Sequence, residues 1–351
     1  MAQRSPIHEA HASAGAAFAE SGGWLLPSGY GGAEAPAAEY AAARTGAALV
    51  DLAERSLLEA SGPQRQKFLQ GMLSNDVLGR TPGQGCMAAL MTAKGHLLVL
   101  LRALVTKDAV LLEMPAERLD PVERTLFHYR VAAPVRFRRR SAAVLGVLGP
   151  GAPGVLGTVG CPVGGLAAEA HLESSVAGQA ARVARASDLP GDGFVLHVEP
   201  EGAEAVWSAL RAAGARPLGR AALDALRVEE GCAWYGRDAT EDSLLHETGL
   251  LRLYHSPTKG CYIGQEVVAR LEARGGHVNK RLRGLRLQAA APPGSSVTAL
   301  GKDVGRVTTS ALSPRLGPIA MAYVHRSHGE PGSVVEVAGE PATVAQLPFD
   351  A

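Results

Sequence analysis

The spacing of apolar and polar positions along the chain predicts a mixed fold of helices and strands. Apolar residues three or four positions apart indicate helices, whereas short apolar runs bounded by turn residues indicate strands. The predicted helices span residues 37–49, 63–73, 115–129, 201–213, 218–230 and 265–273. The predicted strands span residues 50–52, 56–60, 86–92, 96–106, 110–114, 131–139, 142–148 and 193–198.

Four segments depart from this pattern. Residues 1–36 are rich in Gly, Ala, Ser and Pro, and we expect a flexible lead-in there. Residues 150–190 are Gly- and Ala-rich with weak periodicity, and residues 231–258 are expected to form long loops that line a functional site. From residue 278 onward, short strands separated by Pro/Gly turns predict a small antiparallel barrel.

Composition restricts the class of protein rather than its activity. A chain of 351 residues predicts two or three domains, and 46% hydrophobic with 20% charged residues is a globular composition. The formal net charge of +1 does not favour direct nucleic-acid binding. We expect neither a secretory signal nor a membrane span. The four cysteines, none of them in a C-x-x-C pair, are expected to be free thiols in a reducing cytoplasm.

Three patterns that can mark a ligand site are weak here. Residues 149–154 have the G-x-G-x-x-G spacing of a dinucleotide site, but prolines interrupt them, so a Gly/Pro turn is the favoured interpretation. His325 and His328, or His246, do not form a full ligand set, so no metal site is expected. The basic run at 136–140 indicates a solvated strand edge, with phosphate or folate-tail binding as the alternative.

One segment is rich in candidate chemistry, and its notable residues are Lys259, Gly260, Cys261, Tyr262, Gly264, Gln265 and Glu266. The glycines allow a tight approach of the backbone, and a helix is predicted to begin near Gln265. Cys261 lies two residues from Lys259 and close to that helix start, and both features favour a thiolate. Cys261 is therefore a candidate catalytic thiol, with a thiol buried in a tight turn as the alternative.

The same segment carries a resemblance to a known family. The string KGCYIGQEVVARL at residues 259–271, followed by VNKRL at residues 278–282, resembles the signature of the YgfZ-type folate-binding proteins. These proteins belong to the superfamily of the aminomethyltransferase, or T-protein, of the glycine cleavage system. Further blocks resemble the family in the right order, so that the resemblance runs from about residue 37 to the C-terminus; they lie at residues 61–84, 191–198, 225–238 and 247–250.

The resemblance implies an α+β, T-protein-like fold. Two interleaved α+β lobes and a C-terminal antiparallel β-barrel would enclose a central folate-sized pocket. Residues 37–60 and 141–235 would form the first lobe, and residues 61–140 and 236–277 the second. The barrel would take residues 278–351, and the flexible lead-in residues 1–36.

The resemblance also implies a cofactor and residues that bind it. The cofactor would be tetrahydrofolate or a related reduced folate, whose pterin ring offers an amino group and an adjacent N–H to a carboxylate. The glutamate that plays this role in T-proteins maps onto Glu229, with an exposed helix residue as the alternative. Arg237 or Arg252 would meet the carboxylates of the folate tail, with surface charge as an equal alternative.

One departure from the family pattern bears on activity. T-proteins carry acidic residues in a G-G-x-x-D-D segment, and Val99 and Leu100 stand at those positions here. Without that carboxylate we expect no efficient aminomethyl transfer. The resemblance therefore implies a folate-binding protein that supports iron–sulfur cluster assembly or repair in client enzymes, tRNA-modifying ones among them. Its partners would be those enzymes or iron–sulfur assembly factors.

Two other functions stay open at this point. A folate-dependent aminomethyl or methyl transferase, or a demethylase relative of the T-protein, would turn over a methylated amine. A binding protein whose arginine-rich faces dock tRNA or a protein partner is the third function, and the net charge of +1 argues against it.

Overall fold

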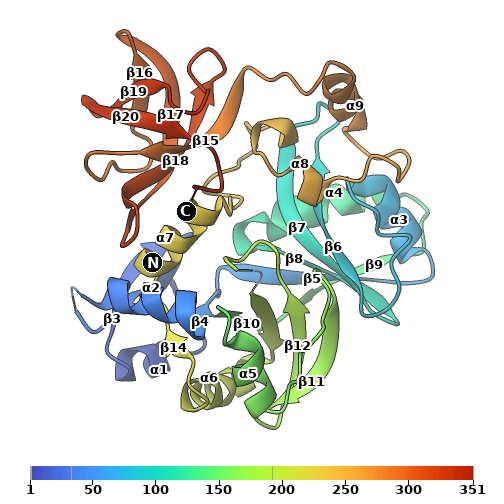
Figure 1. The fold of residues 1–351 in the computed structure, drawn as a ribbon. Helices are drawn as coiled ribbons and strands as arrows, with labels where there is room; N and C mark the ends of the chain where they lie inside the picture. The colour runs from blue at the N-terminus through green and yellow to red at the C-terminus, as the bar shows by residue number, and fades with distance from the viewer. Residues whose placement is uncertain (1, 33, 192, 351) are drawn as a thin grey trace.

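The structure, a computed structural model, describes residues 2–32, 34–191 and 193–350. This described part contains three β-sheets and a closed β-barrel (Figure 1). The α-helices are α1 (His8–Ser13), α2 (Ala35–Thr45), α3 (Arg65–Met72), α4 (Leu119–Arg130), α5 (Ala152–Thr158), α6 (Ala203–Ala212), α7 (Arg220–Glu230), α8 (Leu251–Tyr254) and α9 (Gln265–Ala273). Short 3-10 helices are η1 (Ala116–Arg118), η2 (Pro200–Gly202) and η3 (Leu245–Glu247). Among the described residues, no helix combines the length and the apolar character that crossing a membrane requires.

An antiparallel five-stranded sheet has the strand order β6-β7-β8-β5-β9. Its strands are β5 (Arg55–Ser61), β6 (Gly85–Met91), β7 (Leu97–Val105), β8 (Ala109–Pro115) and β9 (Arg136–Arg140). Alternate side chains of β6 point to opposite faces, and both faces are buried. Ala88 and Leu90 join the core that α3 and α4 cover, whereas Met87 and Met91 join a second core. The second face can therefore form the wall of a buried site.

A six-stranded sheet has the order β11-β12-β13-β10-β4-β14. Its strands are β4 (Ala48–Asp51), β10 (Ala143–Leu148), β11 (His171–Val176), β12 (Gln179–Arg185), β13 (Phe194–Val198) and β14 (Arg216–Pro217). Trp207 and Leu210 of α6 cover one face, and Leu223 and Leu226 of α7 cover the other together with α2. The chain enters this sheet with β4, leaves to build the five-stranded sheet and returns with β10, so the two α+β parts interleave.

The C-terminal segment closes a barrel with the strand order β15-β18-β17-β16-β19-β20. Its strands are β15 (Lys280–Arg286), β16 (Ser296–Ala299), β17 (Lys302–Ser313), β18 (Gly317–His325), β19 (Val334–Val337) and β20 (Glu340–Ala345). The barrel rests on α7 through β17 and β18 (Figure 1). The predicted α+β architecture with a C-terminal barrel is confirmed, and the residue limits of the two lobes stay a prediction.

The prediction of a flexible lead-in at residues 1–36 is wrong for the residues that the structure describes. Helix α1 lies beside a three-stranded sheet of β1 (Gln3–Arg4), β2 (Ala16–Ser21) and β3 (Trp24–Tyr30). Ile7 and Leu26 are fully buried, and Nε2 of buried His11 lies 2.9 Å from the Asp51 carboxylate. Each short element contributes only one or two core residues, and so few apolar positions show no period in the sequence.

The weakly periodic stretch at residues 150–190 also contains regular structure. It holds α5 and the hairpin of β11 and β12. Val155 and Leu156 of α5 share one core with Val176 and Val183 of the hairpin. Many of the surrounding residues are Gly, Ala and Ser, which do not mark a buried face. The alternation of buried and exposed positions along the two strands could therefore not be recognised in the sequence.

Candidate functional site

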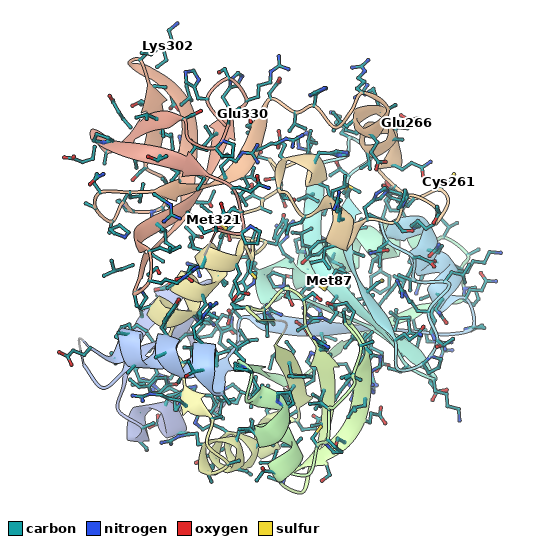
Figure 2. All side chains as sticks on the ribbon, in the orientation of Figure 1. Met87, Cys261, Glu266, Lys302, Met321 and Glu330 are labelled. Atoms are coloured by element: carbon teal, nitrogen blue, oxygen red, sulfur yellow. The ribbon has the colours of Figure 1, made fainter. Side chains whose placement is uncertain are left out.

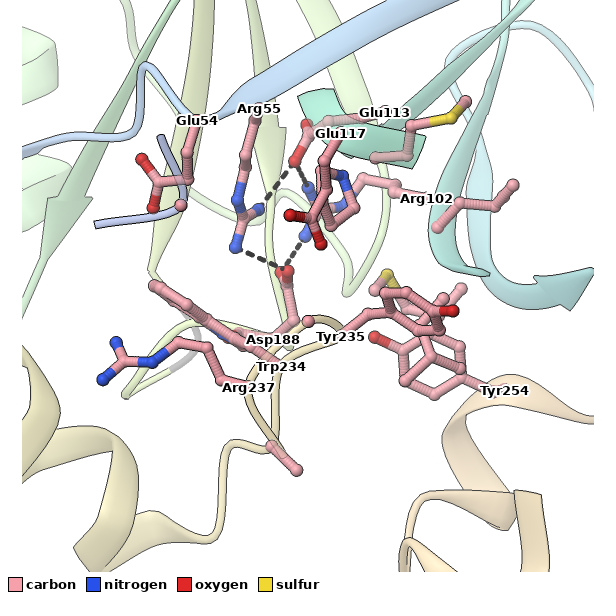
Figure 3. Close-up of a pocket in the computed structure, with 18 of the residues that line it drawn as sticks. Glu54, Arg55, Arg102, Glu113, Glu117, Asp188, Trp234, Tyr235, Arg237 and Tyr254 are labelled. Carbon is pink, nitrogen blue, oxygen red and sulfur yellow. Dashed lines mark hydrogen bonds and ion pairs between the residues drawn. The ribbon is translucent and has the colours of Figure 1, made fainter. Parts of the chain in front are cut away.

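A cavity of about 220 Å³ opens where the five-stranded sheet meets the loops around residues 188 and 233–237. Figure 3 shows the side chains that converge on it. The turn between β2 and β3 and helix α8 contribute the rest of its wall. The lining residues are Ser21, Gly22, Glu54, Arg55, Met87, Leu100, Leu101, Arg102, Glu113, Met114, Pro115, Glu117, Asp188, Ala233, Trp234, Tyr235, Gly236, Arg237 and Tyr254.

One wall of the cavity is apolar and aromatic. Met87 and Leu100 come from the neighbouring strands β6 and β7, whereas Val99 points to the opposite face of the sheet, toward α3 and α4. Tyr235 and Tyr254 complete this wall (Figure 3). Burial raises the pKa of both tyrosine hydroxyls, so both are neutral at physiological pH. This wall offers surfaces against which a flat ring can pack, and it contains no carboxylate.

The other wall is a network of buried ion pairs. The guanidinium of Arg102 on β7 lies 2.9 Å from Glu113 and also contacts Asp188 (Figure 3). Arg55 on β5 contacts the same two carboxylates, at 2.6 Å to Glu113 and 2.9 Å to Asp188. Arg102 is only 1% exposed. Each carboxylate therefore bridges two guanidinium groups, as a buried charge must to offset its loss of hydration.

Two residues behind this wall complete the network. Glu169 accepts a hydrogen bond from Nε of Arg102 at 2.9 Å, and Nε2 of His197 lies 2.6 Å from Glu113. Burial alone would raise the pKa of Glu113, but Arg102, the hydrogen bond with His197 and Arg55 outweigh it and hold that pKa well below its ordinary value. Glu113 is thus a fixed anion. Within the described residues, no group of three or more His, Cys, Asp or Glu is arranged to hold a metal ion.

Trp234 connects the charged wall to the loop that follows α7. The guanidinium carbons of Arg55 and Arg227 lie over its ring, 5.1 and 4.4 Å from the ring centroid. Its indole N–H donates to the carbonyl oxygen of Asp188 at 2.9 Å. Arg227 is in turn fixed by an ion pair of 2.9 Å with Asp238. These contacts hold an irregular loop in one place at the cavity.

Of the three residues predicted to bind folate, Arg237 alone lines the cavity. Its guanidinium donates two hydrogen bonds of 2.7 Å to the two oxygens of Asp224. The side chain keeps 31% of its surface exposed, so Arg237 is oriented and still reaches solvent. Arg252 on α8 is exposed and does not line the cavity.

Glu229 lies outside the cavity, near the C-terminal end of α7. Its carboxylate accepts a hydrogen bond from the Tyr40 hydroxyl at 3.0 Å and another from the Ser313 hydroxyl, and it forms an ion pair of 3.2 Å with Arg315. With 2% of its surface exposed, Glu229 joins α7 to α2 and to the barrel. The structure therefore does not bring Glu229 and Arg237 to one site.

The motif at residues 259–266 lies between α8 and α9 and docks onto the end of α3. The ammonium group of Lys259 donates to two backbone carbonyl groups there and lies 4.8 Å from the Tyr262 ring centroid. Burial lowers the pKa of Lys259 to about 8. Gly264 has a φ of +84°, and a Cβ at this position would lie 2.6 Å from the carbonyl oxygen of Thr92. The motif thus builds a tight contact between the loop and the sheet.

Cys261 is exposed on this loop and does not line the cavity. Figure 2 shows it at the outer edge of the molecule, away from Met87 in the cavity wall. Nearby, the Gln265 side chain accepts the backbone N–H of Tyr262 at 3.0 Å, and Glu266 is exposed. The candidate thiol and the charged wall are therefore at separate places, and a catalytic role for Cys261 stays a prediction.

The exposed thiol of Cys261 should react with iodoacetamide about tenfold faster, or more, than those of Cys86 and Cys161. Burial raises the pKa of Cys86 to about 12 and also raises that of Cys161, and both side chains are inaccessible. Mass spectrometry of peptides sampled over time would measure the rates, and Cys261→Ser should remove the fast phase. Equal labelling of Cys86 and Cys261 in the folded protein would contradict the placement of this loop.

The residues of the charged wall were missed by reasoning from sequence. Arg102 stands within the apolar run LLVLLRALV, and Glu113 within AVLLEMP. A single charge in a buried strand is costly unless it is paired, and this was the signal that could have identified both residues. Asp188 gave no such signal, because it lies in a loop 86 residues from Arg102 in the sequence.

The chain matches two family models that together span most of its length. The GCVT N-terminal domain matches residues 7–256, and the glycine cleavage T-protein C-terminal barrel domain matches residues 280–350. An aminomethyltransferase of Saccharopolyspora erythraea is 32% identical over 372 residues, covering 99% of this chain and 98% of that protein. An aminomethyltransferase of Streptomyces coelicolor is 32% identical over 364 residues, covering 99% and 97%.

A solved structure shares the whole fold. The crystal structure of the glycine cleavage system aminomethyltransferase T from Bartonella henselae superposes with a TM-score of 0.89. The two chains are 24% identical, and the match covers 100% of this chain and 98% of that one. The prediction of a T-protein-like fold is thereby confirmed.

The relatives correct the main functional prediction. They are named for aminomethyl transfer and give no support to a role in iron–sulfur cluster assembly or to iron–sulfur client enzymes, so that prediction is wrong and its transferase alternative is better supported. The predicted cofactor, a reduced folate, agrees with these relatives. With both family models matched in order along one chain, the protein belongs to the glycine cleavage T-protein family.

Proposed function

We propose that this chain is a folate-dependent aminomethyl or methyl transferase, or a demethylase of the same family, and that its reduced folate binds in the cavity. One observation carries the proposal: a single cavity combines an aromatic, apolar wall with a buried network of carboxylates. It supports a folate transferase because the chain resembles aminomethyltransferases over its full length.

The residues of the cavity fit a pterin ring. Such a ring is flat, with apolar faces and N–H donors along one edge. Tyr235, Tyr254 and Met87 offer surfaces for the faces, and Asp188, with 12% of its side chain exposed, offers carboxylate oxygens for the donors. The cavity volume of about 220 Å³ is below the roughly 300–1,000 Å³ of pockets that enclose a whole ligand. It therefore suits the ring, with the folate tail outside and near Arg237.

When bound, the folate supplies the nitrogen atoms that carry the one-carbon unit. The apolar wall excludes water from the ring, and the ion pairs with Arg55 and Arg102 hold the Asp188 carboxylate in position. Strand β7 presents Leu100 to the cavity and therefore supplies no proton acceptor. A carboxylate that meets the reacting amine has to come from another element.

Membership in the YgfZ-type branch is a finer hypothesis that rests on the motif at residues 259–266. The transferase proposal does not depend on it, because this loop lies outside the cavity. The contacts of Lys259 and Gly264 explain the presence of these motif residues by the structure of the loop, without a role in ligand binding.

Filling the cavity should weaken folate binding without unfolding the protein. Leu100→Phe adds a ring to the cavity, and we expect the affinity for tetrahydrofolate to fall about tenfold or more, measured by isothermal titration calorimetry. Val99→Ile is the matched control, since it adds bulk to the adjacent residue on the opposite face of β7. The control should keep the affinity of the unaltered chain, and thermal unfolding would show that both variants are folded.

Two results would count against the proposal. If the unaltered chain does not bind tetrahydrofolate at all, the assignment to a folate transferase fails. If it binds but Leu100→Phe and Val99→Ile bind equally well, the folate lies elsewhere on the protein. A transferase further requires folate-dependent turnover with at least one aminomethyl or methylamine donor, and its absence across such donors would exclude the transfer activity.

A further inference from the structure

The charges that line the cavity do not balance. The lining carboxylates number four and the guanidinium groups three, so the lining has a net charge of −1; they are Glu54, Glu113, Glu117 and Asp188 against Arg55, Arg102 and Arg237. Glu113 and Asp188 are neutralised by their shared arginines, and Glu54 forms an ion pair of 2.6 Å with Arg220. Arg237 is paired with Asp224, so Glu117 is the lining charge left without a partner among the described residues.

Glu117 is the lining carboxylate for which the described residues supply no hydrogen bond and no ion pair. It belongs to the short helix η1 that follows β8, and it lines the cavity while remaining exposed. In Figure 3 its carboxylate points into the space between the two walls, and no dashed line reaches it. An unpaired carboxylate in a cavity can accept a hydrogen bond from a donor group of a ligand.

The loop opposite Glu117 leaves room for its carboxylate. Gly236 has a φ of +88°, and a Cβ at this position would lie 2.6 Å from Oε1 of Glu117. Any other residue would therefore push the carboxylate aside and would be strained in this conformation. The charge of Glu117 is also one of the causes, after burial, that raise the pKa of the adjacent Tyr235. The carboxylate thus lies beside the aromatic wall on which a ring would pack.

We propose that Glu117 is the residue that receives the amine N–H of the bound ligand, and that the cavity selects ligands that carry such an amine at its mouth. This inference rests on the proposed folate-binding function and deepens it. An amine hydrogen donates to the carboxylate, and a protonated amine also neutralises the surplus charge of the lining. Ligands whose corresponding nitrogen is an amide without a hydrogen gain nothing from Glu117.

The test compares two folates that differ at one nitrogen. Tetrahydrofolate has an N–H at N5, whereas in 5-formyltetrahydrofolate that nitrogen is an amide without hydrogen. Glu117→Gln should weaken tetrahydrofolate binding about tenfold, because the amine then donates to a neutral amide oxygen instead of a charged carboxylate, and it should leave 5-formyltetrahydrofolate within about twofold. Titration calorimetry with both ligands gives the ratio of affinities. Glu54→Gln is the matched control, and it should change both affinities alike, because the Glu54 charge is already paired with Arg220.

The possible outcomes separate this inference from the function on which it rests. A selective loss of tetrahydrofolate affinity in Glu117→Gln supports the amine contact. Equal affinities for each folate in the unaltered chain and in Glu117→Gln overturn the inference alone, since folate then binds without Glu117. An equal loss of affinity for both folates also overturns the inference, because Glu117 would then contribute to the shape of the cavity rather than bind the amine. If the unaltered chain binds neither folate, the proposed function fails and the inference with it.

Discussion

Arg102→Met should lower the free energy of unfolding by about 3–5 kcal/mol. The substitution keeps an unbranched side chain of similar length, so it removes the charge rather than the volume. The guanidinium of Arg102 contacts three carboxylates, those of Glu113, Glu169 and Asp188. Removing it leaves buried anions with fewer partners, and the cost of burying a charge then has less to offset it. Urea denaturation followed by circular dichroism would measure the change.

Arg139→Met is the matched control for this effect. Arg139 also contacts two carboxylates, Asp120 and Glu123, but its side chain is 51% exposed. Water replaces those contacts at little cost, so the control should lower stability far less than Arg102→Met does. Equal destabilisation by both substitutions would contradict the view that burial makes the network around Arg102 essential.

The pH dependence of the Arg102→Met deficit follows from Glu113. The folded-state pKa of Glu113 lies below its ordinary value of 4.5, so the carboxylate stabilises the fold above pH 4.5 and loses that contribution as the pH falls through the folded-state pKa. Without Arg102 the pKa of Glu113 rises. The deficit of the variant should therefore be largest at neutral pH and should shrink below pH 4.5. A deficit that grew on acidification would have the wrong sign.

The fold could be predicted from sequence where many apolar residues share one element. Strand β7 and helix α7 each place several apolar side chains on a buried face, and both were expected close to their observed limits. The N-terminal sheet was not expected, because Ile7 and Leu26 lie in short segments without a helical or strand period and become buried only against other elements. Periodicity detects burial within one element and is blind to single residues that pack against distant ones.

The site was less predictable than the fold, for a related reason. The charged wall takes Arg55, Arg102, Glu113 and Asp188 from three strands and a loop, and no local pattern says that these elements meet. The resemblance directed attention to Glu229 and Cys261, which the structure places away from the cavity. Arg237, which the resemblance implies would meet the folate tail, does line the cavity, and its contact with that tail stays a proposal.

The two neighbouring glutamates of α7 show why residue type and helix position were not enough. Glu229 is buried between α2 and the barrel, whereas Glu230 has 30% of its side chain exposed and accepts the backbone N–H of Gly191 at 2.6 Å. A helix turns by about 100° per residue, so adjacent positions face different surroundings. The sequence alone does not say which of them faces the barrel, because the barrel follows much later in the chain.

Glu229→Ala should lower the free energy of unfolding by about 3 kcal/mol and leave folate affinity unchanged in the protein that remains folded. The substitution removes the hydrogen-bond acceptor for Tyr40 and Ser313 and the ion-pair partner of Arg315. The contact between α7 and the barrel therefore loses these buried polar interactions. Glu229→Gln keeps one acceptor and should cost less.

Glu230→Gln is the control beside it. It should change stability by no more than about 1 kcal/mol, because Gln can still accept the backbone N–H of Gly191 and the ion pair with Arg44 is 3.5 Å long and partly exposed. Tetrahydrofolate affinity decides between the two roles of Glu229. If Glu229 bound the pterin, Glu229→Gln would weaken binding strongly. If Glu229 instead stabilises the contact between the barrel and α7, Glu229→Gln binds folate as the unaltered chain does and unfolds at a lower denaturant concentration. Because Glu229 lies outside the cavity and its carboxylate is held by Tyr40, Ser313 and Arg315, we expect the second result.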